Sequence, residues 1–342
     1  MKVGVIGGGG WGTALSVALE SRGHDVRLWV YEPDLMEEMT RTRMNARFLP
    51  GVSIPEPVSF TSSLAEAVRG ADTVLFVTPS HALRASASRL CIEAKDALDR
   101  IEWVTVATKG LEPKTLLRMS EVLGAVLPPG LRDRIVVLAG PSHAEEVARR
   151  VPTLIVAASA DLALAARAQE STSTEWLRTY TNDDVVGVEI GVALKNVIAI
   201  AAGIGDGLGF GDSTKAALLT RGLVEMSRLA RKLGARPETL SGLAGMGDLI
   251  ATATSRHSRN RRLGEAIGRG ATLQEALASS PMVVEGVSTA EAALALARAH
   301  QVELPIVEQV HAILFEGKSA RAALRELLTR DLKAEAETLS RR

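Results

Sequence analysis

Short apolar runs rich in β-branched residues alternate with helical stretches over the first half of the chain. We predict six strands, at residues 3–6, 26–30, 73–78, 104–108, 135–139 and 154–157. Four of these runs are nearly all apolar, which is typical of strands covered on both faces. Because helical stretches separate the runs, we predict an α/β fold with a mostly parallel, doubly wound sheet.

After about residue 184 the strand pattern ends and helix signals follow one another. Ser213 precedes a long amphipathic stretch that ends at Gly234, and Pro305 stands where a helix can begin. Capping-box spacing predicts two further helix starts, at Thr272 with Glu275 and at Ser288 with Glu291. We therefore predict an α/β domain over residues 1–184 and an all-α domain over residues 185–342, with a ligand site in the crevice between them.

Composition limits the classes of protein to which the chain can belong. Its 342 residues suffice for about two domains, and 46% apolar with 23% charged residues is an ordinary globular composition. The 40 basic residues balance the 40 acidic ones, which removes the long-range attraction that drives binding to nucleic acid or anionic membranes. Cys91 is the single cysteine, and glycines interrupt the apolar N-terminal run, unlike in a signal peptide. We therefore expect a cytoplasmic protein that neither inserts into membranes nor binds nucleic acid.

A glycine-rich turn directly follows the first predicted strand and precedes a helical run. It has the spacing G-x-G-x-x-G and comprises, with the residues between the last two glycines, Gly7, Gly9, Gly10, Trp11 and Gly12. The glycines permit a tight turn, close approach of a pyrophosphate and helix–strand packing, and the helix N-terminus then faces the anion. Glu32 lies 20 residues beyond Gly12, where such turns bind a ribose hydroxyl. The sequence thus predicts a Rossmann domain that binds a dinucleotide.

The choice between NAD and NADP stays open on these residues alone. The Glu32 carboxylate would accept hydrogen bonds from a ribose 2′-hydroxyl and repel a 2′-phosphate. Four arginines are near enough in sequence to bind that phosphate instead: Arg27, Arg41, Arg43 and Arg47.

Polar segments follow three of the predicted strands, at the edge where open α/β sheets bind ligands. They are residues 78–81, 108–110 and 140–144. Ser80 and Ser142 are candidates for ligand contact or for purely structural N-caps. Lys109 ends an apolar strand, where a lysine needs a counter-charge.

Lys195 lies in the most apolar segment of the chain, residues 190–205. This segment is too short and too polar for a membrane span, so we predict a helix buried in the protein. Burial lowers the pKa of an ammonium group toward neutrality, as a general base requires. Asn196 and Asp248 are candidates to orient this lysine. The alternative is a lysine whose amine reaches solvent along the helix.

Residues 255–262 combine arginines with serine and asparagine donors. Such a cluster forms a solvated helix face, a nucleic-acid patch or an anion site. Only 3% of the residues are aromatic, which weakens the nucleic-acid alternative because base-stacking side chains are scarce. An arginine fork with neutral donors suits a phosphate group. The histidines lack metal-ligand spacing, so we expect no metal site.

Together these motifs resemble the NAD(P)-dependent glycerol-3-phosphate dehydrogenases of the bacterial type. The resemblance covers nearly the whole chain and rests on residues 5–15, 107–111, 139–142, 187–200, 206–211, 242–249, 258–262 and 283–286. It implies a Rossmann domain followed by a helical domain, a homodimer, and NAD(P)H as the cofactor. The implied reaction interconverts sn-glycerol 3-phosphate and dihydroxyacetone phosphate, which supplies glycerol 3-phosphate for phospholipid synthesis.

The resemblance also implies a role for each matched residue. Lys195 would be the proton acceptor, with Lys109 and Asp248 as its catalytic partners. The residues implied to bind the phosphorylated substrate are Lys109, Gly140, Ser142, Lys195, Asp248, Thr252, Ser258, Arg259 and Asn260. To Gly7, Gly9, Gly12 and Glu32, which the glycine turn and its spacing predict as cofactor contacts, the resemblance adds Gly10, Trp11, Tyr31, Lys109, Ala144, Arg259, Val283 and Glu285.

Two positions depart from the family pattern. Tyr31 stands where many members carry histidine or arginine near the adenosine ribose, which favours NAD, and His143 stands where phenylalanine is common. One alternative is a β-hydroxyacid or ketopantoate-type reductase, against which the arginine cluster favours a phosphorylated substrate. The other is a dinucleotide-sensing protein without catalysis, which the presence of both Lys109 and Lys195 opposes.

Overall fold

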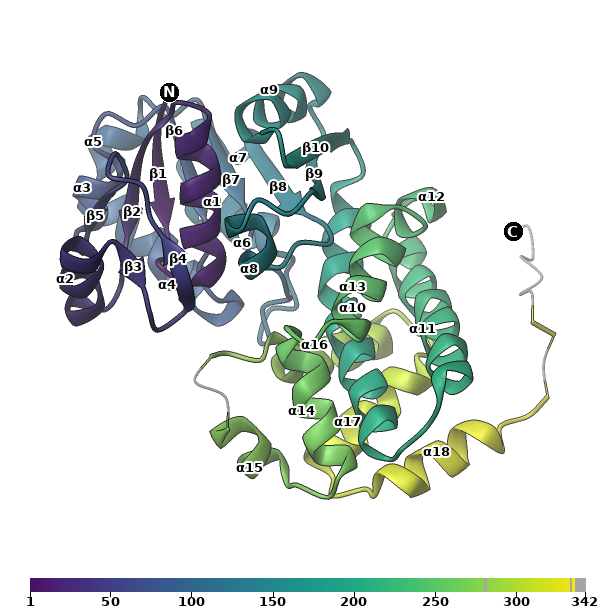
Figure 1. The fold of residues 1–342 in the computed structure, drawn as a ribbon. Helices are drawn as coiled ribbons and strands as arrows, with labels where there is room; N and C mark the ends of the chain where they lie inside the picture. The colour runs from purple at the N-terminus through teal and green to yellow at the C-terminus, as the bar shows by residue number, and fades with distance from the viewer. Residues whose placement is uncertain (280–281, 333, 336–342) are drawn as a thin grey trace.

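The molecule consists of a layer of strands between helices and a separate group of helices (Figure 1). The computed structural model describes residues 1–279, 282–332, 334 and 335. The large sheet has the strand order β10-β9-β8-β7-β6-β1-β2-β5. All neighbouring strands in it pair in parallel except β8 and β9. The predicted mostly parallel, doubly wound sheet followed by an all-α part is thus confirmed.

All six predicted strands are present close to their predicted bounds. The strands of the large sheet are β1 (Lys2–Ile6), β2 (Asp25–Trp29), β5 (Ser59–Thr61), β6 (Thr73–Phe76), β7 (Trp103–Val106), β8 (Ile135–Ala139), β9 (Thr153–Ala158) and β10 (Leu177–Asn182). A small hairpin pairs β3 (Met44–Asn45) with β4 (Leu49–Ser53). The sequence pattern missed β3, β4 and the edge strands β5 and β10. These strands are short or partly exposed, so they contain no continuous apolar run.

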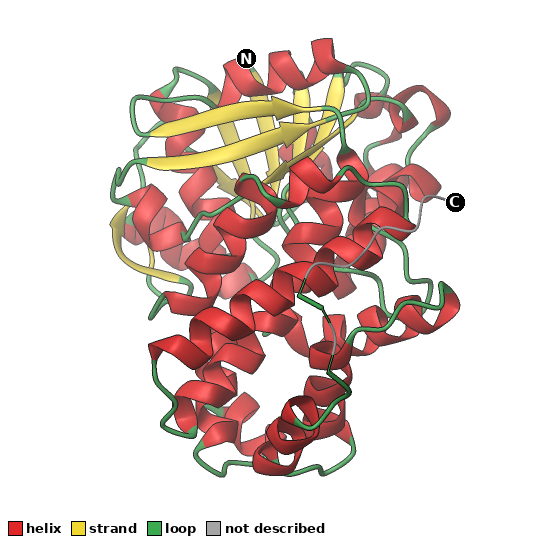
Figure 2. Ribbon diagram, turned by 90° about the vertical axis from the view of Figure 1, so that its right-hand side faces the viewer, coloured by secondary structure: helices red, strands yellow, loops and turns green. Residues whose placement is uncertain are grey.

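Helices cover both faces of the large sheet, whose strands lie among them in the upper part of Figure 2. They are α1 (Gly10–Ser21), α2 (Pro33–Thr42), α3 (Leu64–Val68), α4 (Ser80–Glu93), α5 (Lys95–Leu98), α6 (Met119–Val126), α7 (Pro129–Arg132), α8 (Ala144–Ala148) and α9 (Leu162–Thr172). Every residue of β6 and β7 is buried as a result. The carboxyl ends of these central strands lead into the site.

The second half of the chain contains helices and loops but no strand among its described residues. Its elements are α10 (Val185–Gly207), α11 (Asp212–Lys232), α12 (Pro237–Leu240), the π-helical turn η1 (Leu243–Gly247), α13 (Asp248–Thr254), α14 (Arg259–Gly268), α15 (Leu273–Ala278), α16 (Glu285–Ala299), α17 (Pro305–Phe315) and α18 (Ala320–Leu328). The capping box of Thr272 with Glu275 is confirmed at the start of α15. The one predicted for Ser288 with Glu291 is wrong, because α16 already begins at Glu285 and Ser288 donates to its carbonyl oxygen.

Helix α10 is the centre of the helical part. It is long and apolar enough to cross a membrane, yet 83% of its most apolar stretch is buried inside the protein. The predicted buried helix is therefore confirmed. Glycines bring α14 close: a Cβ at Gly203 would collide with the Arg261 carbonyl group, and one at Gly264 with that of Ile200. This close packing sets the start of α14 beside the middle of α10.

Candidate active site

The predicted glycine turn joins the carboxyl end of β1 to the N-terminus of α1. Gly7 has a φ of +132°, a conformation that residues with a Cβ rarely adopt. A Cβ at Gly12 would collide with the Gly7 carbonyl group, so α1 can begin this close to β1 only with glycine there. Gly9 has open space beside it, whereas a Cβ at Gly10 would collide with the Phe48 carbonyl group and would lie 3.7 Å from Ala144 of α8. The turn is therefore open to a ligand at Gly9.

Two buried polar groups near this edge of the sheet lack a partner within the described residues. They are the indole N–H of Trp11 in the turn and the hydroxyl of Thr78 just after β6. Buried polar groups in proteins nearly always have a hydrogen-bond partner. Donors left over beside an open glycine turn and a helix N-terminus fit the phosphate and ribose oxygens of a dinucleotide.

At the end of β2, the Glu32 carboxylate is available to a ligand, whereas three of the four arginines near it in sequence bind other groups of the protein. Glu32 is the N-cap of α2, but its carboxylate makes no capping hydrogen bond. The guanidinium groups of Arg27 and Arg43 donate to backbone carbonyls, and Arg47 pairs with Asp34 at 2.7 Å. The acid is thus better placed than these arginines to meet a ribose.

Tyr31, next to Glu32, is 67% exposed and packs edge-on against Trp29, with 5.8 Å between the ring centroids. Its side chain brings no positive charge to the end of β2. A 2′-phosphate would therefore gain no ion pair from this position.

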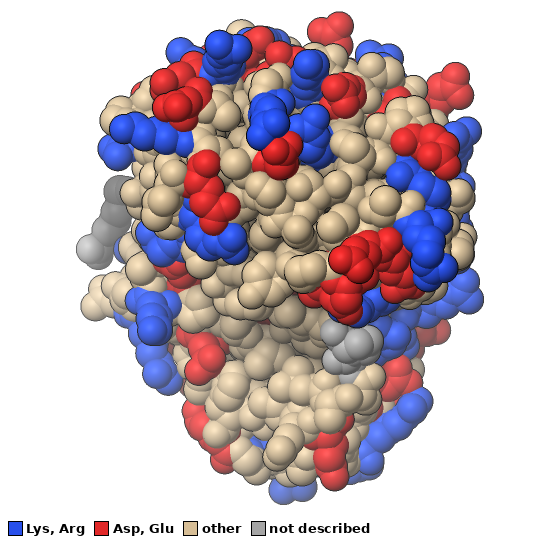
Figure 3. Space-filling model, turned by 90° about the vertical axis from the view of Figure 1, so that its left-hand side faces the viewer, with Lys and Arg blue, Asp and Glu red and all other residues tan. Residues whose placement is uncertain are grey.

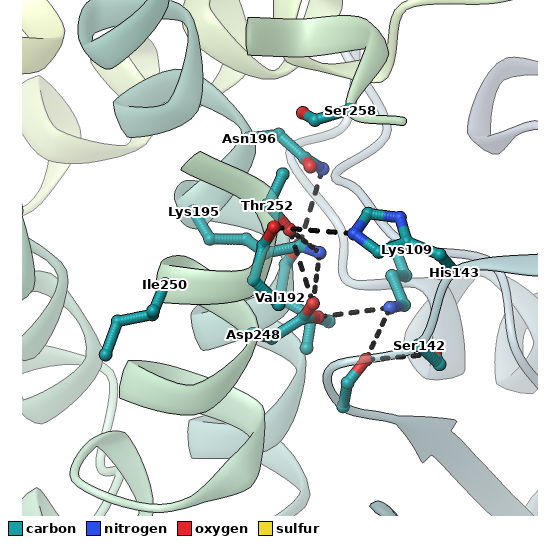
Figure 4. A network of polar contacts seen from close by, with 12 residues as sticks. Lys109, Ser142, His143, Val192, Lys195, Asn196, Asp248, Ile250, Thr252 and Ser258 are labelled. Carbon is teal, nitrogen blue, oxygen red and sulfur yellow. Dashed lines mark hydrogen bonds and ion pairs between the residues drawn. The ribbon is translucent and has the colours of Figure 1, made fainter. Parts of the chain in front are cut away.

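Two lysines share one carboxylate where the helical part meets the sheet (Figure 4). Lys195 of α10 donates from Nζ to Oδ1 of Asp248 at 2.5 Å and to Oγ1 of Thr252 at 2.7 Å. Lys109, just after β7, donates to Oδ2 of Asp248 at 3.1 Å and to the Gly140 carbonyl at 2.9 Å. The site therefore joins residues from both halves of the chain.

Local backbone structure explains how this cluster forms. Asp248 and Thr252 are four residues apart on α13, so both side chains lie on the helix face toward Lys195. A Cβ at Gly191 would meet the Ala244 carbonyl at 2.5 Å, so this glycine lets η1 and α13 lie against α10. On the sheet side, the Ser142 hydroxyl donates to the Gly140 carbonyl at 3.0 Å.

Burial sets the acid–base properties of the cluster. The Lys195 side chain is 6% exposed and that of Asp248 is 2% exposed, so an amine in bulk solvent is ruled out. Burial lowers the pKa of Lys195 from 10.5 to about 7, although the charge of Asp248 opposes this shift. Burial also raises the pKa of Asp248, but the two lysine charges outweigh it and the pKa is lowered overall. Near neutral pH, Lys195 exists in both protonation states beside an ionised carboxylate.

Asn260 connects three helices near this cluster. Its side-chain nitrogen donates to Oδ1 of Asn196 at 2.9 Å, and its oxygen accepts from the backbone N–H of Gly286 at 2.9 Å. Asn196 is the neighbour of Lys195 on α10. The start of α14 and the start of α16 are therefore held at a fixed place relative to the catalytic candidate.

The basic segment that contains Asn260 divides into two groups. Ser258 is the buried N-cap of α14, and burial lowers the pKa of Arg259, which donates to the Val283 carbonyl at 2.7 Å. Arg261 instead pairs with Asp206 at 2.7 Å, and Arg256 and Arg262 are exposed to solvent. The segment is thus partly a solvated helix face and partly a candidate anion site.

Sequence reasoning singled out Ser80 and Glu285 separately but missed that they pair. Glu285, at the start of α16, accepts from the backbone N–H of Ser80 at 3.0 Å and from its hydroxyl at 2.5 Å. Ser80 begins α4 in the sheet domain. Their 205-residue separation left no signal in the sequence.

A second connection between the two halves was missed entirely. Glu189 on α10 accepts from Arg118 at 2.6 Å and from the backbone N–H and hydroxyl of Ser120 at 2.8 and 2.6 Å. Burial raises the pKa of Glu189, and the Arg118 charge opposes this. These contacts fix the first turns of α10, and therefore Lys195, relative to the sheet.

On the face of the molecule shown in Figure 3, a recess with a mostly uncharged surface separates the upper and lower parts. Among the residues that the structure describes, no three or more histidine, cysteine, aspartate or glutamate side chains are grouped so that they could hold a metal ion.

The first domain contributes a glycine turn that suits a dinucleotide, and the second contributes a buried amine with a pKa of about 7. This combination is typical of NAD(P)-dependent oxidoreductases with a Rossmann and a helical domain. Family models described as NAD-dependent glycerol-3-phosphate dehydrogenase match residues 2–165 with the N-terminal and residues 184–325 with the C-terminal part. The chain belongs to this family.

Individual relatives agree over almost the full length. The chain is 52% identical over 334 residues to a protein of Geobacter metallireducens named glycerol-3-phosphate dehydrogenase (NAD(P)+), covering 98% of each. It is 38% identical to the glycerol-3-phosphate dehydrogenase of Coxiella burnetii in a solved structure, with a TM-score of 0.89 and coverage of 96% and 99%. A ketopantoate reductase of Ralstonia eutropha, at 18% identity and a TM-score of 0.58 with coverage of 96% and 100%, shares the fold alone.

Proposed function

We propose that the protein interconverts sn-glycerol 3-phosphate and dihydroxyacetone phosphate with NAD(P)(H). The observation that carries this proposal is the Lys195 amine, buried between Asp248 and Thr252, with a pKa of about 7. Membership of the family and the arginine at the start of α14 support a phosphorylated substrate over a carboxylate one.

A bound nicotinamide dinucleotide supplies the hydride donor and acceptor for this reaction. The open glycine turn, the N–H of Trp11 and the Glu32 carboxylate are the groups that would hold it. The rest of the cofactor site would be lined by Ala144 next to Gly10, by Val283, which binds Arg259, and by Glu285, which binds Ser80.

Lys195 moves the proton in the proposed mechanism. In the oxidative direction its neutral amine removes the proton of the C2 hydroxyl, and in the reductive direction its ammonium donates a proton to the carbonyl oxygen. Asp248 and Thr252 hold Nζ in place. The charge of Asp248 also raises the pKa of Lys195 against the effect of burial, so that the ammonium form is still populated near pH 7. Lys109 stabilises negative charge that develops on the same oxygen, an effect worth about 3 kcal/mol in comparable sites.

The start of α14 anchors the substrate phosphate. Arg259 supplies the charge. The Ser258 hydroxyl and the second amide N–H of Asn260, beyond the one bonded to Asn196, would supply neutral donors next to it. Because the phosphate lies on C3, its binding energy serves to orient C2 toward Lys195. Gly140 and Ser142 close the opposite side of the site beside Lys109.

NADH is the preferred cofactor in this proposal. Glu32 offers an uncommitted acceptor to a ribose 2′-hydroxyl, while Arg27, Arg43 and Arg47 are engaged elsewhere. We expect the KM for NADPH to exceed that for NADH, and Glu32→Ala to narrow the difference by weakening NADH binding. A KM for NADPH at least tenfold below that for NADH would contradict the role of Glu32.

The decisive assay follows NADH and NADPH oxidation with dihydroxyacetone phosphate and with a panel of 2-oxo acids that includes ketopantoate. We expect turnover with dihydroxyacetone phosphate alone. Comparable turnover with a 2-oxo acid would favour the reductase alternative, and no turnover at all would favour the non-catalytic one.

We further propose a division of the chain at residues 184/185, a homodimer, a cytoplasmic location and a role in supplying glycerol 3-phosphate to phospholipid synthesis. The end of β10 at Asn182 and the start of α10 at Val185 support the division. Light scattering on the purified protein tests the dimer, and a monomeric mass would exclude it.

A further inference from the structure

The His143 side chain reaches the lysine cluster, but the mechanism above gives it no task. His143 precedes α8 in the sheet domain, and its Nε2 lies 3.4 Å from the Ala251 carbonyl oxygen on α13 (Figure 4). Ala251 is the residue before Thr252, which binds Lys195. Since a carbonyl oxygen can only accept, Nε2 carries the ring proton in this contact.

The other ring nitrogen is therefore a hydrogen-bond acceptor. Burial lowers the pKa of His143, and the nearby charges of Lys195 and Lys109 lower it further against the opposing hydrogen bond to Ala251. The ring is neutral at pH 7, so Nδ1 has a free lone pair. No residue in the described part of the chain donates a hydrogen bond to it.

The ring lies between the reacting end and the phosphate end of the site. The charges of Lys195 and Lys109 lower the pKa of His143, so the ring is close enough to feel both amines. On the other side, its centroid is 6.0 Å from the ring of His257, the residue directly before Ser258. His257 has a nearby carboxylate of its own, with Nδ1 at 4.0 Å from Oε1 of Glu145. A three-carbon substrate that extends from Lys195 to the start of α14 would pass the His143 ring.

Such a substrate has three polar groups, and the proposed function provides partners for two of them. Lys195 and Lys109 meet the oxygen on C2, and the start of α14 meets the phosphate on C3. The hydroxyl on C1 is left without an acceptor. A buried hydroxyl that loses its water needs one, and a site that provides it discriminates against analogues that lack the hydroxyl.

We propose that Nδ1 of His143 accepts a hydrogen bond from the C1 hydroxyl of the substrate and thereby selects substrates that carry this group. The proposal rests on the proposed function, because the C1 hydroxyl is defined by that substrate. It makes His143 a specificity-determining residue, while proton transfer stays with Lys195.

The test compares dihydroxyacetone phosphate with its 1-deoxy analogue, in which a methyl group replaces the CH2OH group. Three variants separate the two ring nitrogens. His143→Asn keeps an amide oxygen near the position of Nδ1, His143→Gln keeps an amide near Nε2 and its contact with Ala251, and His143→Phe keeps only the volume. The measured quantity is kcat/KM for dihydroxyacetone phosphate divided by kcat/KM for its 1-deoxy analogue.

We expect this ratio to fall about tenfold in His143→Phe and His143→Gln, as for loss of one hydrogen bond, and to be largely retained in His143→Asn. The same ratio in His143→Phe and in the wild type would overturn the proposal. So would retention in His143→Gln with loss in His143→Asn, because the effect would then come from the contact with Ala251.

A matched control is His257→Asn, which alters the neighbouring ring but leaves Nδ1 of His143 in place. We expect it to leave the ratio unchanged even if the overall rate falls, and a tenfold fall in the ratio would count against His143 as its source. Failure of the wild type to reduce dihydroxyacetone phosphate would instead refute the proposed function. Thermal unfolding of each variant confirms that the compared proteins are folded.

Discussion

Two buried groups in the helical domain, Lys195 and Glu225, both have a pKa of about 7, which is lowered from 10.5 for the lysine and raised from 4.5 for the glutamate. In both, burial is the main cause. Glu225 on α11 accepts from the backbone N–H groups of Ile306 at 2.8 and 3.0 Å and of Val307 at 3.3 Å, at the start of α17. Lys195 is instead held by two side chains of α13, one of which, Asp248, also binds Lys109 of the sheet domain.

The difference between them shows what a shifted pKa means. The partners of Glu225 are two backbone donors that need an acceptor, so this carboxylate satisfies a buried helix end. Lys195 shares Asp248 with Lys109, which follows a strand of the sheet domain, so the three groups lie where the two domains meet. Burial alone therefore does not indicate catalysis, whereas a buried amine that shares a carboxylate with a second lysine where two domains meet is a candidate for it.

Substitution of Lys195 should have the largest effect on catalysis. Lys195→Met removes the group that we propose to give and take the proton, so we expect kcat to fall by about 10²- to 10⁴-fold in both directions. Cofactor binding, measured by quenching of tryptophan fluorescence, should change little. A folded variant with near-normal kcat would contradict the assignment.

Removal of the proposed phosphate anchor should have the next largest effect. Arg259→Ala deletes a charge-assisted contact, so we expect KM for dihydroxyacetone phosphate to rise about 10- to 100-fold, with a smaller change in kcat. Arg262→Ala, an exposed neighbour on the same helix, serves as the matched control. An equal effect of both substitutions would indicate that net charge, and not a defined anchor, binds the phosphate.

The role of Glu225 predicts a pH effect on stability and not on catalysis. Its folded pKa of about 7 lies above the ordinary 4.5, so the folded state holds its proton through this window. Stability should fall as pH rises from about 5 to 8, with a contribution of about 1–3 kcal/mol from this residue. Urea unfolding at both values checks this, and Glu225→Gln should remove that part of the slope while kcat stays normal. The same slope in wild type and variant would exclude Glu225 as its source.

Local patterns predicted the parts of this molecule that are determined locally. The first strand, the glycine turn and α1 follow from spacing within a dozen residues, and apolar neighbours on all sides of Lys195 sufficed to predict its burial. The position of Asp248 after a glycine-rich segment made it a candidate, although its pairing with both lysines required the structure.

Long-range contacts account for what the sequence could not predict. Two long-range hydrogen bonds hold the start of α16, one between Ser80 and Glu285 and one between Asn260 and Gly286. The helix therefore begins at Glu285, and the capping box expected around Ser288 does not form. The acceptor role of Glu225 was equally hidden, because its donors are 81 residues away. The contact of His143 with α13 likewise crosses between domains.

The central claim is that the Lys195 amine, with a pKa of about 7, carries the proton of the reaction. Its most direct test is the pH dependence of kcat/KM in both directions. Ionisation of substrate phosphates affects the two directions alike, whereas Lys195 must be protonated for reduction and neutral for oxidation. The account predicts that the reductive rate falls and the oxidative rate rises with pH, each with a midpoint near 7. Profiles without opposite limbs between pH 6 and 8 would contradict it.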